Sequence, residues 1–83
     1  MVKIVFSPHA RWQLMERKIS EREVLETIEK PDNVTRQSND RFQAVKIKER
    51  KGKGYLLIVI YEETLLVQEV ITTFYTSKIK KYL

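Results

Sequence analysis

The hydrophobic pattern changes its period at Pro31-Asp32, and this change most limits what the chain can fold into. Before this point apolar residues recur at helical spacing, whereas after it they alternate with polar residues as in β-strands. Helices in one segment and strands in another are typical of α+β proteins. The 83 residues are enough for one small domain, which we expect to span residues 1–83.

The first helix has a clear start. Ser7 can cap it, and Pro8 suits the first helical position because its fixed φ matches the helix and it needs no amide donor there. We expect this helix to reach about Arg17. The residues expected to face inward are Ala10, Leu14 and Met15.

A second helix start follows at once. Ser20 and Glu23 have the spacing of a capping box, and Ile19 and Val24 occupy the positions of a hydrophobic staple. Pro31 ends this helix, since the residue before a proline is pushed out of helical conformation. The expected apolar stripe consists of Val24, Leu25 and Ile28.

The remaining segments have the pattern of strands. We expect strands at residues 2–6, 34–37, 42–50, 55–61 and 65–75. The expected turns are Ser38–Asp40, Lys51–Gly54 and Glu62–Thr64. This βααββββ order predicts a curved antiparallel sheet with the two N-terminal helices packed on one face.

Composition excludes several kinds of site. The chain has no cysteine, so disulfides and thiolate chemistry are absent, and His9 is its one histidine, which excludes a histidine-rich zinc site within one chain. We expect neither a metal nor another cofactor. No apolar run approaches the roughly 18 residues of a membrane span, and the first residues are too short a stretch for a signal peptide. The expectation is a cytoplasmic protein that does not enter a membrane.

The net charge of +5 lies entirely in the second half of the chain. Residues 1–40 contain seven Lys/Arg and seven Asp/Glu, whereas residues 41–83 contain nine and four. Such asymmetry indicates a basic surface for a polyanion or for an acidic protein. The alternative is the charge-rich surface of a heat-stable protein.

One basic stripe lies on the expected strand 42–50. Lys46, Lys48 and Arg50 occupy alternate positions, so they should stand in a row about 6–7 Å apart on one face. This interval resembles that between neighbouring phosphates, and Lys51 and Lys53 extend the charge into the turn. The alternative is a solvated face whose lysines discourage aggregation between sheet edges.

His9 is a second candidate. It falls near the start of the first helix, where the helix dipole disfavours protonation of the imidazole. A neutral imidazole could accept a proton or contact a phosphate together with Arg17. The alternative is a structural histidine that ties the helix to the sheet.

The third candidate is the C-terminal tail. A β-rich run through Tyr75 is followed by the basic and aromatic residues Lys78, Lys80, Lys81 and Tyr82. Lysines beside tyrosines suit phosphate contact and base stacking. RNA cleavage through the 2′-hydroxyl needs a base, an acid and cations, and Arg41 adds a further cation.

The sequence also resembles a known family. The resemblance rests on Phe6–Ala10, Glu16–Ser20, Val24, Ile28, Pro31-Asp32, Val70–Tyr75 and Lys80–Tyr82. These segments are similar to domain-of-unknown-function family 4258, within the RelE/ParE-like toxin superfamily. The resemblance implies a RelE-like fold and kinship with ribosome-dependent mRNA interferases and gyrase poisons. In the RelE branch, basic residues on the sheet act with a tyrosine or histidine near the last strand or tail.

Together these features predict a toxin-type, metal-independent endoribonuclease that acts on RNA or at the ribosome. The expected catalytic residues are His9, Lys48 and Tyr82. The expected RNA-binding residues are Arg17, Arg41, Lys46, Arg50, Lys53, Tyr75, Lys78, Lys80 and Lys81. Two alternatives stay open: a non-catalytic module that binds nucleic acid or an acidic, antitoxin-like protein, and a domain whose charges serve stability alone.

Overall fold

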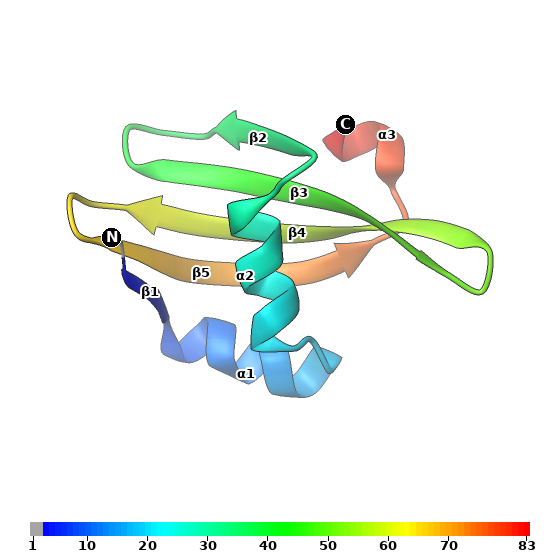
Figure 1. Cartoon of the computed structure of the whole chain (residues 1–83), viewed down its shortest axis with the longest axis horizontal. Helices are drawn as coiled ribbons and strands as arrows, with labels where there is room; N and C mark the ends of the chain where they lie inside the picture. Colours follow the sequence, from blue (N-terminus) through cyan, green and yellow to red (C-terminus); the bar gives the residue numbers. More distant parts are fainter. Residues whose placement is uncertain (1–2) are drawn as a thin grey trace.

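A five-stranded sheet carries three helices in the computed structural model, which describes residues 3–83 (Figure 1). The elements are β1 (Lys3–Phe6), α1 (Pro8–Arg17), α2 (Glu21–Glu29), β2 (Asn33–Arg36), β3 (Arg41–Arg50), β4 (Lys53–Glu63), β5 (Val67–Thr76) and α3 (Ile79–Tyr82). The α+β class is confirmed, and α3 is an addition to the expected order. Val2, which we assigned to the first strand, lies outside the described residues. None of the helices within residues 3–83 is long and apolar enough to cross a membrane.

The sheet is mixed rather than wholly antiparallel. Its strand order is β1-β5-β4-β3-β2, and β2 to β5 pair antiparallel as expected. At one edge, however, β1 runs parallel to β5, with Lys3 opposite Val67 and Phe6 opposite Val70. The prediction of an antiparallel sheet was therefore wrong at this edge. The physical reason is that the first strand pairs with the last one, and parallel strands need a long crossover connection such as the one that α1 and α2 begin.

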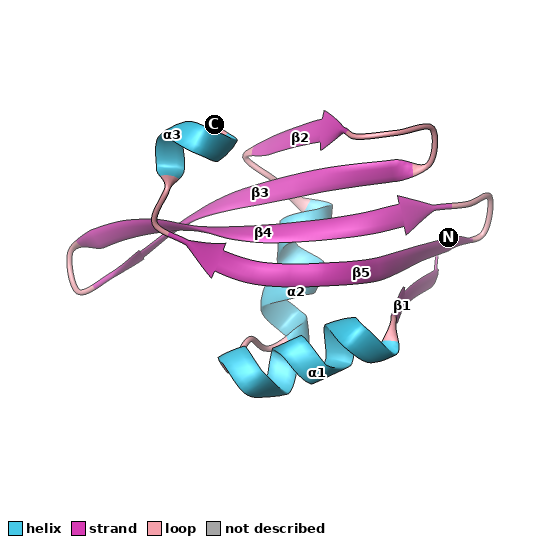
Figure 2. Cartoon of the chain, turned by 180° about the vertical axis from the view of Figure 1, so that it is seen from behind, coloured by secondary structure: helices cyan, strands magenta, loops and turns pink. Residues whose placement is uncertain are grey.

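The two faces of the sheet are covered differently. We call the face that carries α1 and α2 the helix face, and the opposite face, on which α3 lies at one end, the tail face (Figure 2). The buried cluster of the helix face consists of Ala10, Leu14, Ile19, Val24, Ala44, Leu57, Val59, Tyr61 and Val70. The cluster of the tail face consists of Val45, Leu56 and Ile58, with Ile60, Phe74, Ile79 and Tyr82 packed against it. Strand β4 is therefore buried on both faces, with Leu57 and Val59 on the helix face and Leu56 and Ile58 on the tail face.

The helix caps form where the sequence predicts them. The Ser7 hydroxyl accepts a hydrogen bond from the Ala10 amide at 3.0 Å, and the Ser20 hydroxyl accepts one from the Glu23 amide at 3.1 Å. Lys18 ends α1 in the left-handed conformation, with φ of 53°. These local signals placed both helix starts correctly.

The inward face of α1 differs from the expected one. Met15 is 81% exposed, so its predicted inward position was wrong, whereas the polar Gln13 is buried. Beyond Val70 the outer edge of β5 no longer pairs with β1. The Gln13 side-chain oxygen accepts there from the Thr73 amide at 2.9 Å and from the Thr72 hydroxyl at 2.7 Å. A polar residue lies inward because a strand edge covered by a helix still needs a hydrogen-bond acceptor.

The β3–β4 hairpin closes through a two-residue turn. Arg50 pairs with Lys53, and the residues between them, Lys51 and Gly52, have φ of 53° and 76°. Two successive positive φ values match the type I′ turn that suits the twist of a hairpin. A turn forms where we predicted one, but it is shorter than the expected Lys51–Gly54, because Lys53 and Gly54 already pair with β3. The hairpin tip extends beyond the helices (Figure 1).

Candidate functional site

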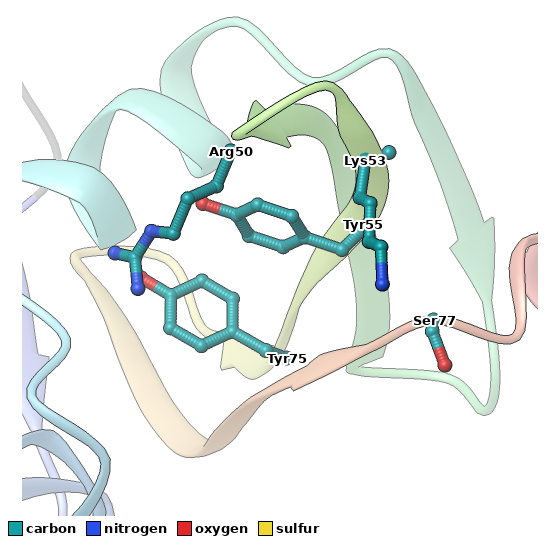
Figure 3. A pocket seen from close by; sticks show the side chains of 6 residues that line it. Arg50, Lys53, Tyr55, Tyr75 and Ser77 are labelled. Atoms are coloured by element: carbon teal, nitrogen blue, oxygen red, sulfur yellow. The ribbon is translucent and has the colours of Figure 1, made fainter.

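A cavity of about 360 Å³ lies where the tip of the β3–β4 hairpin meets the end of β5 (Figure 3). Its lining residues are Arg50, Lys53, Gly54, Tyr55, Tyr75 and Ser77. Three of them, Arg50, Lys53 and Tyr75, are among the residues that the sequence predicts to bind RNA. We call this hollow the hairpin cavity.

Two tyrosine rings form the wall of the hairpin cavity. Tyr55 on β4 and Tyr75 on β5 meet edge to face, with ring centroids 5.1 Å apart and an interplanar angle of 84°. Tyr75 lies directly opposite Leu57, two residues along β4 from Tyr55, so the two rings are diagonal neighbours on the helix face. Both residues are half-buried. The cavity therefore offers aromatic surface of the kind on which bases stack.

The Tyr75 hydroxyl is tied to α2. It donates a hydrogen bond to a carboxylate oxygen of Glu23 at 2.5 Å. Burial, and then this hydrogen bond, raise the pKa of Tyr75 well above its usual value, while Arg50 acts weakly in the opposite direction. Tyr75 therefore keeps its proton at neutral pH and acts there as a donor rather than as a base.

Cations stand on two sides of the aromatic wall. Figure 3 shows the Arg50 guanidinium pointing toward the Tyr75 hydroxyl, whereas Lys53 and Ser77 lie on the other side of the rings. Lys48 is directly opposite Tyr55 in the β3–β4 pairing, so it shares the helix face with both rings. The hairpin cavity is thus aromatic in its middle and cationic at its rim.

The cations predicted on β3 have different partners in the structure. The Lys46 ammonium group donates to the Lys30 carbonyl at 2.9 Å, so it satisfies the C-terminal end of α2. Arg41 pairs with Glu62 at 2.8 Å and lies at the far end of β3, about 30 Å along the strand from Arg50. Of the cations on β3, only Arg50 lines the hairpin cavity, and Lys48 lies directly opposite Tyr55 in the strand pairing.

The three residues predicted to be catalytic do not converge. His9 is exposed on α1, where its ring stacks on Trp12 at 6.1 Å, and it is not part of the cavity lining. Tyr82 packs on Phe74 on the tail face, with ring centroids 6.1 Å apart. Lys48 is on the helix face, so the sheet itself separates it from Tyr82. A joint catalytic role of these residues stays a prediction without support from their placement.

The other predicted RNA-binding residues are exposed. Arg17 lies in the last turn of α1. Lys78, Lys80 and Lys81 are on or next to α3, and Lys81 lies over the Tyr82 ring at 5.6 Å. Since Ser77 lines the hairpin cavity and directly precedes Lys78, the basic tail begins at the cavity.

Sequence reasoning missed Gly54, Tyr55 and Ser77 of the lining, and also Glu23, the partner of Tyr75. Tyr55 could have been found by pairing the hairpin around Lys51-Gly52, because this register places Tyr55 opposite Lys48. Glu23 carried only the signal of a capping box, and nothing local links it to Tyr75, which lies 52 residues away. Within residues 3–83, no group of three or more His, Cys, Asp or Glu side chains is arranged to hold a metal ion.

Comparison with protein families identifies the chain. A family model described as a domain of unknown function (DUF4258) matches residues 6–75, which is most of the chain. The chain belongs to this family. The match spans all of the cavity residues except Ser77, and it leaves out α3 and the Lys80–Tyr82 segment that contributed to the resemblance. Searches of curated proteins and of solved structures gave no match.

Proposed function

We propose that this protein binds single-stranded RNA through the hairpin cavity. The observation that carries the proposal is the edge-to-face pair of Tyr55 and Tyr75 between two cations, Arg50 and Lys53. Sites for single-stranded nucleic acid combine aromatic rings, on which bases stack, with basic side chains that follow the backbone. A volume of about 360 Å³ lies in the range of small-ligand sites, so the cavity suits one nucleotide of a longer strand.

The distribution of charge supports this orientation of the ligand. Lys48, Arg50, Lys53 and the tail lysines gather at the hairpin end, whereas Glu62, Glu63 and Glu69 lie together at the opposite end of β4 and β5. A polyanion is therefore attracted toward the cavity end of the molecule. Contacts that release counterions should make this binding strongly dependent on salt.

A binding assay with matched variants tests the proposal. The probe is a fluorescently labelled octauridylate at low salt, and the readout is its anisotropy. We expect Tyr55→Leu to weaken binding about tenfold, because stacking contributes about 1–3 kcal/mol per base. Tyr82→Leu is the control, since it removes an equally aromatic residue from the tail face. Absence of binding by the unmodified protein, or an equal loss of affinity in the two variants, would contradict the proposal. A comparison with oligodeoxyuridylate of the same length shows whether RNA is preferred over DNA.

A second candidate function is RNA cleavage within a RelE-like fold. Two helices followed by the antiparallel strands β2 to β5 support kinship with the RelE/ParE-like superfamily, as the resemblance implies. The specific observation in favour of cleavage is that the Tyr75 hydroxyl and the Arg50 guanidinium lie side by side at the hairpin cavity (Figure 3). Tyr75 could protonate the leaving 5′-oxygen while Arg50 stabilises the charged phosphate, which are two of the three roles in this reaction. Binding is therefore our first proposal and cleavage our second.

Incubation with free mRNA and with ribosome-bound mRNA tests the second function. We expect cleavage to be lost in Tyr75→Phe and kept in His9→Ala and Tyr82→Ala. Loss in the latter two variants would instead favour the catalytic residues expected from the sequence. An acidic, antitoxin-like protein partner and a cytoplasmic location also remain predictions. Binding of an acidic protein without binding of RNA would favour the antitoxin-like partner.

A further inference from the structure

In the described part of the chain, the Glu23 carboxylate does not accept a hydrogen bond from the nearby Ser20 amide, as it would in a complete capping box. Glu23 is the third residue of α2, and its own amide donates to the Ser20 hydroxyl. In a complete capping box, the side chain at this position also reaches back to the amide of the capping residue. Within residues 3–83 no such bond joins the Glu23 carboxylate to the Ser20 amide, because the carboxylate accepts from Tyr75 instead. Only one half of the capping box is therefore formed.

The position of this carboxylate opposes the binding of an anion. Glu23 is half-buried and shares the Tyr75 hydroxyl, toward which the Arg50 guanidinium points (Figure 3). A phosphate that enters here would need the same hydroxyl as a donor. It would also meet the negative charge of Glu23 at a distance where partial burial limits screening.

We propose that Glu23 gates the hairpin cavity, leaving Tyr75 when a phosphodiester enters and completing the capping box at Ser20. This inference rests on the proposed function, because the ligand is the backbone of a single-stranded nucleic acid. The movement is short, since a side chain at the third helical position reaches the capping amide without any change of backbone. One hydrogen bond replaces another, and a carboxylate at the helix start also interacts favourably with the helix dipole.

Glu23 therefore determines the affinity of the cavity. In the free protein it holds the Tyr75 ring against Tyr55 and lowers the positive charge at the rim. The free energy needed to release Glu23 from Tyr75 is subtracted from that of ligand binding. The measured affinity is therefore lower than that of a cavity without the gate. Removal of the charge at Glu23 should then strengthen binding, in contrast to the changes of Tyr55 and Arg50.

Two measurements test the gate with octauridylate as the probe. In the first, Glu23→Gln should bind about three- to fivefold more tightly than the unmodified protein. The matched control is Glu29→Gln, which makes the same change of net charge on α2 and should bind within about twofold of the unmodified protein. Thermal melting confirms that both variants are folded.

The second measurement uses the unmodified protein and needs no variant to fold. Saturation with octauridylate should slow hydrogen exchange of the Ser20 amide, because that amide gains the Glu23 carboxylate as its acceptor. Equal or weaker binding by Glu23→Gln than by Glu29→Gln, or unchanged exchange at Ser20, would overturn the gate. If the unmodified protein binds and only these results fail, the proposed function survives; if neither it nor Glu23→Gln binds, both proposals fail.

Discussion

Both faces of the sheet carry aromatic and basic residues near the β3–β4 hairpin, but the hairpin cavity lies on the helix face. On the helix face, Tyr75 and Tyr55 stand beside Arg50 and leave a cavity between them. On the tail face, Tyr82 packs on Phe74, Lys81 lies over the Tyr82 ring, and Lys78 and Lys80 are exposed. Aromatic and basic composition is thus not sufficient for a binding site. What decides is whether a covering element fills the space above the rings.

The covering elements explain this difference. On the tail face the short helix α3 reaches the hairpin backbone, where a Cβ on Gly54 would lie 3.5 Å from the Ile79 side chain. On the helix face α2 contacts the site through Glu23 and ends near Lys46, so the hairpin tip extends beyond it. The cavity lies where the hairpin extends past the helices that cover this face (Figure 1).

The largest expected effects compare the two buried clusters. Leu57 on the helix face and Leu56 on the tail face are both fully buried. Substitution of either by alanine should lower the free energy of unfolding by about 2–5 kcal/mol. We expect the greater loss for Leu57→Ala, because the tail-face cluster has fewer fully buried residues and can relax more easily around a void. Urea unfolding measures both; a greater loss for Leu56→Ala would reverse the comparison.

The next effect separates the cations of the two faces. We expect combined Lys48→Gln, Arg50→Gln and Lys53→Gln changes to reduce the salt slope of octauridylate binding by about 2, since each phosphate contact on a single strand contributes about 0.7. The matched variant carries Lys78→Gln, Lys80→Gln and Lys81→Gln and should reduce the slope by less than about 1. Equal reductions would show that the tail lysines bind RNA as the sequence predicts. Anisotropy titrations over a series of salt concentrations give both slopes.

A smaller effect concerns alkaline pH. The pKa of Tyr75 is higher in the folded protein than the value of about 10 in an unfolded chain. The contribution of Tyr75 to the free energy of unfolding is thus complete below about pH 10. It falls as pH rises further, because the Tyr75 hydroxyl then loses its proton in the unfolded chain but not in the folded protein. We expect Tyr75→Phe to flatten the decline of stability above pH 10. Urea midpoints from pH 7 to pH 11 test this; an unchanged decline would contradict it.

The smallest effect concerns the hairpin turn that both faces share. Lys51 has a positive φ, which is strained for a residue with a side chain. Lys51→Gly should raise stability by about 0.5–1 kcal/mol, after allowance for the entropy that glycine loses on folding. The matched change is Lys18→Gly, where the same strain ends α1 away from the cavity. Melting temperatures compare the two; a loss of stability in both would contradict the assignment of strain.

Local signals account for what could be predicted of the fold. Ser7, Ser20 and Pro31 act on neighbouring residues, so the helix boundaries followed from the sequence, as did the turn at Lys51-Gly52. The pairing of β1 with β5 joins residues more than 60 positions apart and left no comparable signal. Met15 was misplaced because the need of the β5 edge for a hydrogen-bond acceptor cannot be read from the periodicity of α1.

The site was predictable only in part for the same reason. Alternation placed Lys46, Lys48 and Arg50 on one face, which the structure confirms, but it could not show that Lys46 would bind the end of α2. Nor could it show that Tyr82 lies on the opposite face from Tyr75. Each of these outcomes depends on an element that is distant in the sequence.

The sequence by itself determined two capped helices, a set of alternating strands and a basic second half, because capping, periodicity and charge act over a few residues. Only the tertiary structure decided that Tyr55, Tyr75, Arg50 and Lys53 line one cavity and that the Tyr75 hydroxyl donates to Glu23. It also turned the aromatic tail into a cover for the other face. Strand register and helix docking set these contacts, and both result from burying apolar surface across the whole chain.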